Sequence, residues 1–180
     1  MIAAVFDTET TGLIDNHVLK LDRQPEVVEF ACVMVRDWEE RVSEYQTLIR
    51  PRVWPIATEV REKGALRLSD EELERQPSFS QVAQDIERVL SSADAVVAHN
   101  LSFDMEMIDI EFERLGRKLA WPSIKICTVE QSIFFVGGRL NLTDLLFKLT
   151  QREHRGAHRA MADVLATVDC LAEMKRRGWL

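Results

Sequence analysis

The sequence contains few cysteines, no segment rich in Pro, Gly or Ser, and no long apolar run. Its three cysteines, Cys32, Cys127 and Cys170, are scattered and form no Cys-x-x-Cys pair. We therefore expect free thiols in a reducing compartment rather than a disulfide framework. No repeat or linker interrupts the 180 residues, which fits a single domain over residues 1–180.

The N-terminus shows no pattern of a signal peptide or a membrane span. Its apolar run, Ile2 to Phe6, has five residues, no basic residue before it and Asp7 directly after it. A membrane-spanning helix needs about 20 apolar residues. We expect a cytoplasmic protein that does not contact a membrane.

An excess of positive charge is also missing, since the formal net charge is −7. This balance argues against a general nucleic-acid coat protein, which would be basic. It leaves nucleases open, because carboxylates that bind divalent cations count as negative until the metal reverses the local charge.

Apolar periodicity predicts strands and helices that alternate along the second half of the chain. The expected strands are residues 2–6, 27–35, 45–49 and 93–98. The expected helices start near Ser78–Ser80 and cover about 101–115, 141–148 and 160–175. Strands come first and helices then alternate with single strands, so the predicted class is α/β with a mixed sheet.

Asp7 and Glu9 form a pair of acids at the end of the first predicted strand. The period of two places both side chains on one face of the strand and Thr8 on the other. Carboxylates this close repel each other, and a divalent cation between them would remove that cost. Taken alone, the same pair is also typical of a solvated strand end.

Two later segments carry further candidates for the same chemistry. Asp104 lies in the first turn of a predicted helix after a His-Asn turn, where an acid is also a common partner of the helix dipole. His158 and Asp163 are five residues apart and converge only if His158 precedes the last helix. Gly156 permits that break, although a histidine near a helix start is often a cap or a surface residue.

Together these segments resemble one enzyme family in order, spacing and flanking residues. The stretches FDTETTG, HNLSFD and HRAMAD look like the three motifs of the DEDDh exonucleases, over about residues 5–172. Among its members the sequence is most similar to the proofreading type of bacterial DNA polymerase III. The resemblance implies a ribonuclease H-like fold, a mixed sheet flanked by helices.

The resemblance also implies a mechanism. Asp7, Glu9, Asp104 and Asp163 would bind two Mg²⁺ or Mn²⁺ ions that flank the scissile phosphate. His158 would be the general base that takes a proton from the attacking water, which suits a group titrating near neutrality. The expected products are nucleoside 5′-monophosphates released from the 3′ end.

Further residues would contact the substrate by the same resemblance. The terminal nucleotide would lie against Thr10, Thr11 and Gly12, and its base against Leu13 and Phe103, which could equally be core residues. The substrate-binding residues expected on the family pattern are Thr10, Thr11, Gly12, Leu13, His99, Asn100 and Phe103.

The resemblance does not assign a role to two stretches of the sequence. The polymerase III type usually has a His-Gly pair where this sequence has residues 62–66, so we expect no histidine contact there. Residues 151–156 include Arg152, His154 and Arg155 just before His158. This stretch is either a solvated loop or a loop that contacts phosphate, whose binding would weaken with salt.

The expected substrate is the 3′ end of single-stranded nucleic acid, with DNA favoured over RNA and a DNA polymerase as a candidate partner. One alternative is an RNA-trimming exonuclease of the same family, since RNA is distinguished by its 2′ hydroxyl. Another is an accessory module that grips a 3′ end or a polymerase without cutting, which has no need of all five site residues. The chain ends soon after the last helix, at Trp179 and Leu180, so we expect a free-standing nuclease.

Overall fold

The computed structural model describes residues 1–17, 20–56, 58 and 66–180. These residues form a five-stranded sheet in the order β3-β2-β1-β4-β5. Strand β1 is antiparallel to β2 and parallel to β4, while β5 is parallel to β4. This arrangement confirms the predicted mixed sheet. The strands are β1 (Ile2–Thr10), β2 (Val27–Arg36), β3 (Glu40–Leu48), β4 (Ala95–Ala98) and β5 (Ile124–Cys127).

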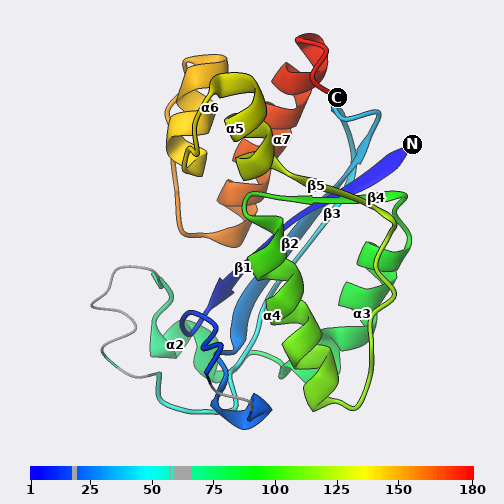
Figure 1. Cartoon of the computed structure of the whole chain (residues 1–180). Coiled ribbons are helices and arrows are strands. Elements are labelled where there is room, and N and C mark those ends of the chain that lie inside the picture. Colours follow the sequence, from blue (N-terminus) through cyan, green and yellow to red (C-terminus); the bar gives the residue numbers. More distant parts are fainter. Residues whose placement is uncertain (18–19, 57, 59–65) are drawn as a thin grey trace.

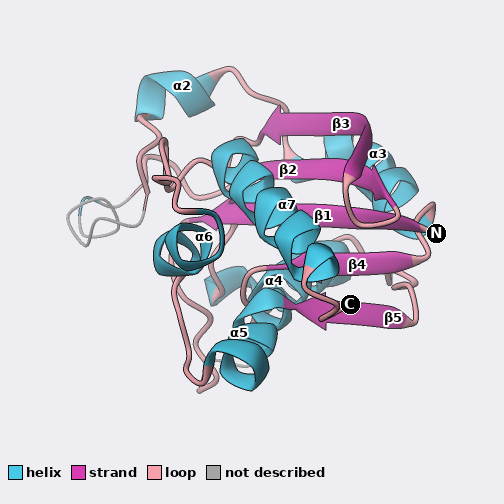
Figure 2. Cartoon of the chain, turned by 90° about the horizontal axis from the view of Figure 1, so that it is seen from above, coloured by secondary structure: helices cyan, strands magenta, loops and turns pink. Residues whose placement is uncertain are grey.

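Helices cover both faces of the sheet, which gives three layers (Figures 1 and 2). Helices α3 (Phe79–Ser91) and α4 (Leu101–Arg114) pack on one face, and α7 (Ala160–Arg176) crosses the other. Helix α6 (Leu142–Thr150) packs against α7. Helix α5 (Thr128–Val136) also contacts α7 and lies at the same end of the molecule. The remaining elements are η1 (Leu21–Arg23) and α2 (Asp70–Glu74).

Side chains of β1 alternate between these two layers. Ala4 and Phe6 pack with α3 and α4, whereas Ala3 and Val5 pack with α7. Each of these apolar sets is buried in its own cluster. The register of the strand is therefore fixed, because a slip of one residue would turn each set to the opposite layer. The alternation therefore fixes which layer each polar residue at the end of β1 faces.

Strand β1 extends beyond its parallel neighbour. It pairs with β4 only over Ala3 to Val5, so residues 6–10 continue past the end of β4. On its other side the strand stays paired with β2 as far as Thr10. The overhang leaves backbone groups of β1 open to partners from the helix that follows β4.

Most predicted elements are present with similar bounds. The helices expected near 78–80 and over 101–115, 141–148 and 160–175 are α3, α4, α6 and α7. Strand β3 starts five residues earlier than predicted, while β5, α5 and α2 were not predicted. The segment aligned with the family's His-Gly pair falls largely outside the described residues, of which only Leu66 belongs to it.

Two expectations about the whole chain can be compared with the structure. All three cysteines are free, and Cys32 and Cys170 are buried, as the sequence predicts. Within the described ranges, no helix combines the length and the apolar character that crossing a bilayer requires.

Candidate active site

The end of β1 brings two acids next to a third from α7. Asp7 and Glu9 face the α7 layer, and Asp163 lies in the first turn of α7. One carboxylate oxygen from each of the three lies within 4.8 Å of the others. Oxygen atoms at this separation can share a divalent cation, which prefers carboxylate ligands.

Burial and mutual repulsion shift the pKa values of these three acids upward. Burial is the larger cause for Asp7, whose pKa lies well above its usual value, and Asp104 and Asp163 add repulsion. The pKa of Glu9 is raised to about 8 for the same two reasons. Burial also raises the pKa of Asp163, although His154 and the backbone of His158 partly offset that rise. Without a cation, the cluster therefore favours protonated carboxyls.

Asp104 reaches the site from the other layer of the fold. Its side chain is 3% exposed, and its Oδ1 accepts the Thr8 amide at 3.0 Å and the Thr8 hydroxyl at 2.7 Å. These bonds use the part of β1 that extends past β4. Asp104 is not one of the three clustered carboxylates, but its charge raises the pKa of Asp7. Burial raises its own pKa to about 7.

A fifth acid, Glu29, lies beside the cluster and was not singled out in the sequence. It is opposite Glu9 in the β1–β2 pairing and is completely buried. Arg159 donates to it at 3.1 Å, the Ala160 amide at 3.3 Å and the Gln46 side chain at 2.7 Å. These bonds attach the start of α7 to β2. The available signal was a single charged residue within the apolar run VVEFACVMV.

Two histidines approach Asp163, and only one was predicted. His158 precedes α7 in a left-handed backbone conformation (φ 68°), its amide lies 3.3 Å from Asp163 Oδ2, and its side chain is exposed. His154 has a side chain only 4% exposed, and its Nε2 lies 2.9 Å from Asp163 Oδ1. The side chain of His154 is therefore buried within the 151–156 loop, whose other residues are exposed.

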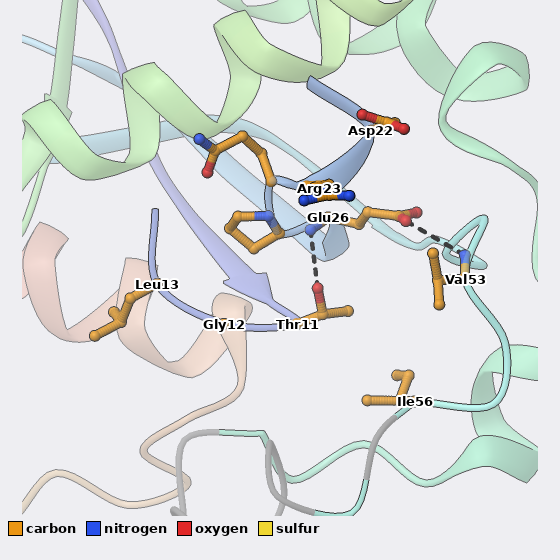
Figure 3. Close-up of a pocket in the computed structure, with 10 residues that line it drawn as sticks. Thr11, Gly12, Leu13, Asp22, Arg23, Glu26, Val53 and Ile56 are labelled. Atoms are coloured by element: carbon orange, nitrogen blue, oxygen red, sulfur yellow. Dashed lines mark hydrogen bonds between the residues drawn. The ribbon is translucent and has the colours of Figure 1, made fainter. Parts of the chain in front are cut away.

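A pocket of about 420 Å³ begins at Thr11, two residues after Glu9 in the chain (Figure 3). Thr11, Gly12 and Leu13 line one side of it, and Val53 and Ile56 lie across from them. The Thr11 hydroxyl accepts the Glu26 amide at 2.9 Å, and the Thr10 hydroxyl donates to the Gly12 carbonyl at 2.7 Å. Leu13 is 84% exposed, so it is not a core residue.

His99 and Asn100 line a second pocket, of about 370 Å³, which also contains Arg139. His99 Nδ1 lies 2.8 Å from the Thr128 hydroxyl, and burial lowers the pKa of His99 to about 4, so it is neutral near pH 7. Arg139 donates to the Asn100 side chain at 3.4 Å. Phe103 is half-buried and packs against the α3–α4 core.

The charges in the 151–156 loop have different surroundings. Arg152 is paired with Asp169 of α7, which also lies 3.5 Å from Arg41. The side chain of Arg155 is 90% exposed. Part of the positive charge in this loop is therefore used within the protein.

Comparison with known sequences identifies the family. Residues 4–171 match the Exonuclease family (RNase_T). DNA polymerase III PolC-type from Bacillus subtilis (strain 168) is 29% identical over 174 residues, covering 94% of this chain and 11% of that protein. DNA polymerase III subunit epsilon from Buchnera aphidicola subsp. Schizaphis graminum is 26% identical over 166 residues, covering 88% of this chain and 68% of that protein. The chain thus spans about a tenth of the PolC-type relative.

Solved structures share the fold. The nuclease domain of 3'hExo, a DEDDh family member bound to rAMP, superimposes with a TM-score of 0.78 at 14% identity, covering 98% of this chain and 92% of that one. The complex of E. coli ExoI with ssDNA gives a TM-score of 0.78 at 16% identity, covering 98% and 41%. The chain therefore belongs to the Exonuclease (RNase_T) family, and it shares its fold with the nuclease domain of a DEDDh family member.

Proposed function

We propose that this domain removes nucleotides from the 3′ end of single-stranded DNA in a reaction that requires two divalent metal ions. The observation that carries the proposal is the cluster of Asp7, Glu9 and Asp163 within 4.8 Å. A pocket lined by Thr11, Gly12 and Leu13, which follow Glu9 in the chain, supports it.

The chemistry of the cluster fits Mg²⁺ or Mn²⁺. Its ligand atoms are carboxylate oxygens, which hard divalent ions prefer to sulfur or nitrogen. The raised pKa values of Asp7, Glu9 and Asp104 reflect a cost that a cation would remove. Asp7, Glu9 and Asp163 would bind one ion directly, and Asp104 would share in a second beside Asp7.

Ions held by Asp7, Glu9 and Asp163 would supply Lewis acidity to a water molecule and would offset the negative charge that develops on the phosphate and on the leaving 3′ oxygen. His158 removes the proton from the attacking water. Its exposed position at the start of α7 lets the imidazole approach a substrate that lies over Asp163. A general base placed in this way contributes about 10²–10⁴-fold to the rate.

The 420 Å³ pocket would bind the terminal nucleotide. Leu13 offers an exposed apolar surface at its rim, and a base that stacks on such a surface is bound without regard to its identity. Thr10 to Gly12 bring polar backbone close to the 3′ hydroxyl. The second pocket, with His99, Asn100 and Arg139, would receive the next part of the strand, where Arg139 offers a positive charge to phosphate.

DNA is the proposed substrate because the named relatives are DNA polymerase III proteins. The same names support a DNA polymerase as a partner. This partnership is tested by mixing the domain with the purified catalytic subunit of a DNA polymerase. A shift of both proteins to one earlier gel-filtration peak supports the partnership, and separate elution opposes it.

The activity is tested with 5′-labelled single-stranded DNA, its RNA equivalent and a duplex, each incubated with Mg²⁺ or EDTA. A ladder that shortens from the 3′ end, and that is absent in EDTA and with Asp7→Asn, is the expected result on DNA. Faster cleavage of RNA would assign the domain to RNA trimming. Binding without cleavage, with Mn²⁺ also tried, would favour an accessory module.

A further inference from the structure

His154 is a buried polar side chain that the proposed mechanism does not use. It lies in the loop between α6 and α7, and its side chain is only 4% exposed. Its Nε2 is 2.9 Å from Asp163 Oδ1, and solvent reaches neither atom. Among the described residues, neither atom has a partner with good hydrogen-bond geometry. A buried donor and a buried acceptor at this separation can satisfy each other, and such bonds often align only when a substrate or ion is bound.

The loop that carries His154 is fixed against α7. Gly156 has a left-handed backbone (φ +82°), and a Cβ added there would lie 3.3 Å from the Ala162 Cβ. A side chain at this position would be strained by the left-handed backbone and would press on Ala162, which favours glycine where the loop approaches the first turn of α7. Arg152 is paired with Asp169, two turns further along the same helix. Contacts on both sides of His154 thus set its position relative to Asp163.

The second ring nitrogen of His154 determines which tautomer is favoured. Its Nδ1 lies 3.2 Å from the Thr143 hydroxyl of α6. A hydroxyl that donates to Nδ1 leaves the proton on Nε2, which then points to a carboxylate. The other oxygen of Asp163, Oδ2, faces the His158 amide at 3.3 Å. A nitrogen of the 154–158 segment therefore lies near each of the two carboxylate oxygens.

We propose that His154 is a positioning residue that orients the Asp163 carboxylate for metal binding, through a Thr143–His154–Asp163 chain of hydrogen bonds. Partners of this kind fix the plane of a ligating carboxylate, and their loss costs about 10–100-fold in metal affinity or activity. The inference rests on the proposed metal site.

The test measures Mn²⁺ binding directly, by electron paramagnetic resonance of the unbound ion, in His154→Leu and His154→Gln. Both replacements are close to histidine in volume, but only glutamine can donate to Asp163. We expect the dissociation constant to rise about 10–100-fold in the leucine variant and to stay near the wild-type value in the glutamine variant. Arg155→Ala, in the same loop with a side chain 90% exposed, is the matched control and should bind as wild type.

Wild-type affinity in His154→Leu would overturn the inference, as would equal losses in the leucine and glutamine variants or in Arg155→Ala. Melting temperatures in EDTA separate a loss of folding from a loss of metal binding. A wrong assignment of the metal site itself would give a different result. In that case wild-type protein would not bind Mn²⁺, or Asp7→Asn would bind it as tightly as wild type.

Discussion

The carboxylates of Asp7, Glu9 and Asp163 repel one another whenever no cation lies between them. The pKa of Glu9 is about 8 and that of Asp104 about 7, against usual values of 4.5 and 3.8. Burial is the first cause in each case, and neighbouring acids add to it for Glu9. The folded protein therefore binds protons that the unfolded chain has already released.

This shift predicts how stability depends on pH. A carboxyl whose pKa is raised on folding stabilises the protein fully below its unfolded value, and that stability is lost as the pH rises through the folded value. In EDTA, the free energy of unfolding should fall between about pH 5 and pH 8. Mg²⁺ should reduce the fall. Urea titrations at several pH values check this, and a flat or rising profile in EDTA would contradict it.

Replacing one crowded carboxylate should separate stability from activity. Asp7→Asn removes a charge from the cluster, so the metal-free protein should melt higher, by about 2–4 °C for each kcal/mol of repulsion relieved. Cleavage should fall by at least about 10³-fold, which corresponds to about 4 kcal/mol of transition-state stabilisation. Calorimetry and single-turnover cleavage measure the two effects. Full activity in purified Asp7→Asn would show that the metal site is assigned wrongly.

Loss of the exposed histidine should affect the reaction and not the binding of metal. His158→Ala should lower kcat by about 10²–10⁴-fold, because the general base is removed. The affinity for Mn²⁺ should remain unchanged. If that affinity falls instead, His158 binds the metal and is not the base.

At the scale of helices and strands, Arg114 connects α4 to the segment that lines the 420 Å³ pocket. Its side chain is 6% exposed, pairs with Glu111 at 2.8 Å and donates to the carbonyls of Leu21 and Gln24. Glu111 also accepts the Val27 amide at 3.0 Å. One buried pair therefore links α4, β2 and the segment that lines the 420 Å³ pocket.

Removing one partner should destabilise both the fold and the pocket. Arg114→Met leaves Glu111 buried without its partner, which costs about 3–5 kcal/mol. It should also raise KM for single-stranded DNA, because the 21–24 segment loses its anchor. Arg88→Met is the control, since Arg88 of α3 is 72% exposed and pairs with Asp85 on the surface, a contact worth about 1 kcal/mol or less. Equal melting temperatures for the two variants would contradict this account.

The sequence predicts the elements whose patterns are regular. Helices α3, α4 and α7 show apolar faces at helical spacing; the predicted start of α3 and the predicted bounds of α4 and α7 are confirmed to within one residue. Strand β3 was predicted too short because Glu40 to Glu44 are all exposed at the sheet edge and only Val42 among them is apolar. Strand β5 was missed because Ile124 and Lys125 are exposed in a run of only four residues.

Contacts between distant elements could not be predicted from periodicity. Thr8 lies on the opposite face of β1 from Asp7 and Glu9, as expected, but its bond to Asp104 depends on β1 extending beyond its pairing with β4. His154 reaches Asp163 only because the backbone at Gly156 turns the loop onto α7. Neither arrangement leaves a repeating pattern in the sequence.

Over the molecule as a whole, the net charge of −7 and the proposed substrate carry the same sign. Binding of a polyanion then depends on local positive charge, which the metal ions and Arg139 would supply. The central claim is therefore that metal ions contact the scissile phosphate.

Sulfur substitution at that phosphate tests the claim most directly. Single-stranded DNA with a phosphorothioate of defined configuration at its 3′-terminal linkage is compared with normal DNA, in Mg²⁺ and in Mn²⁺. Mg²⁺ prefers oxygen, whereas Mn²⁺ accepts sulfur more readily. We predict that one configuration is cleaved slowly in Mg²⁺ and recovers in Mn²⁺, with no cleavage in EDTA. Equal rates for both configurations in both metals, or cleavage in EDTA, would contradict the two-metal account.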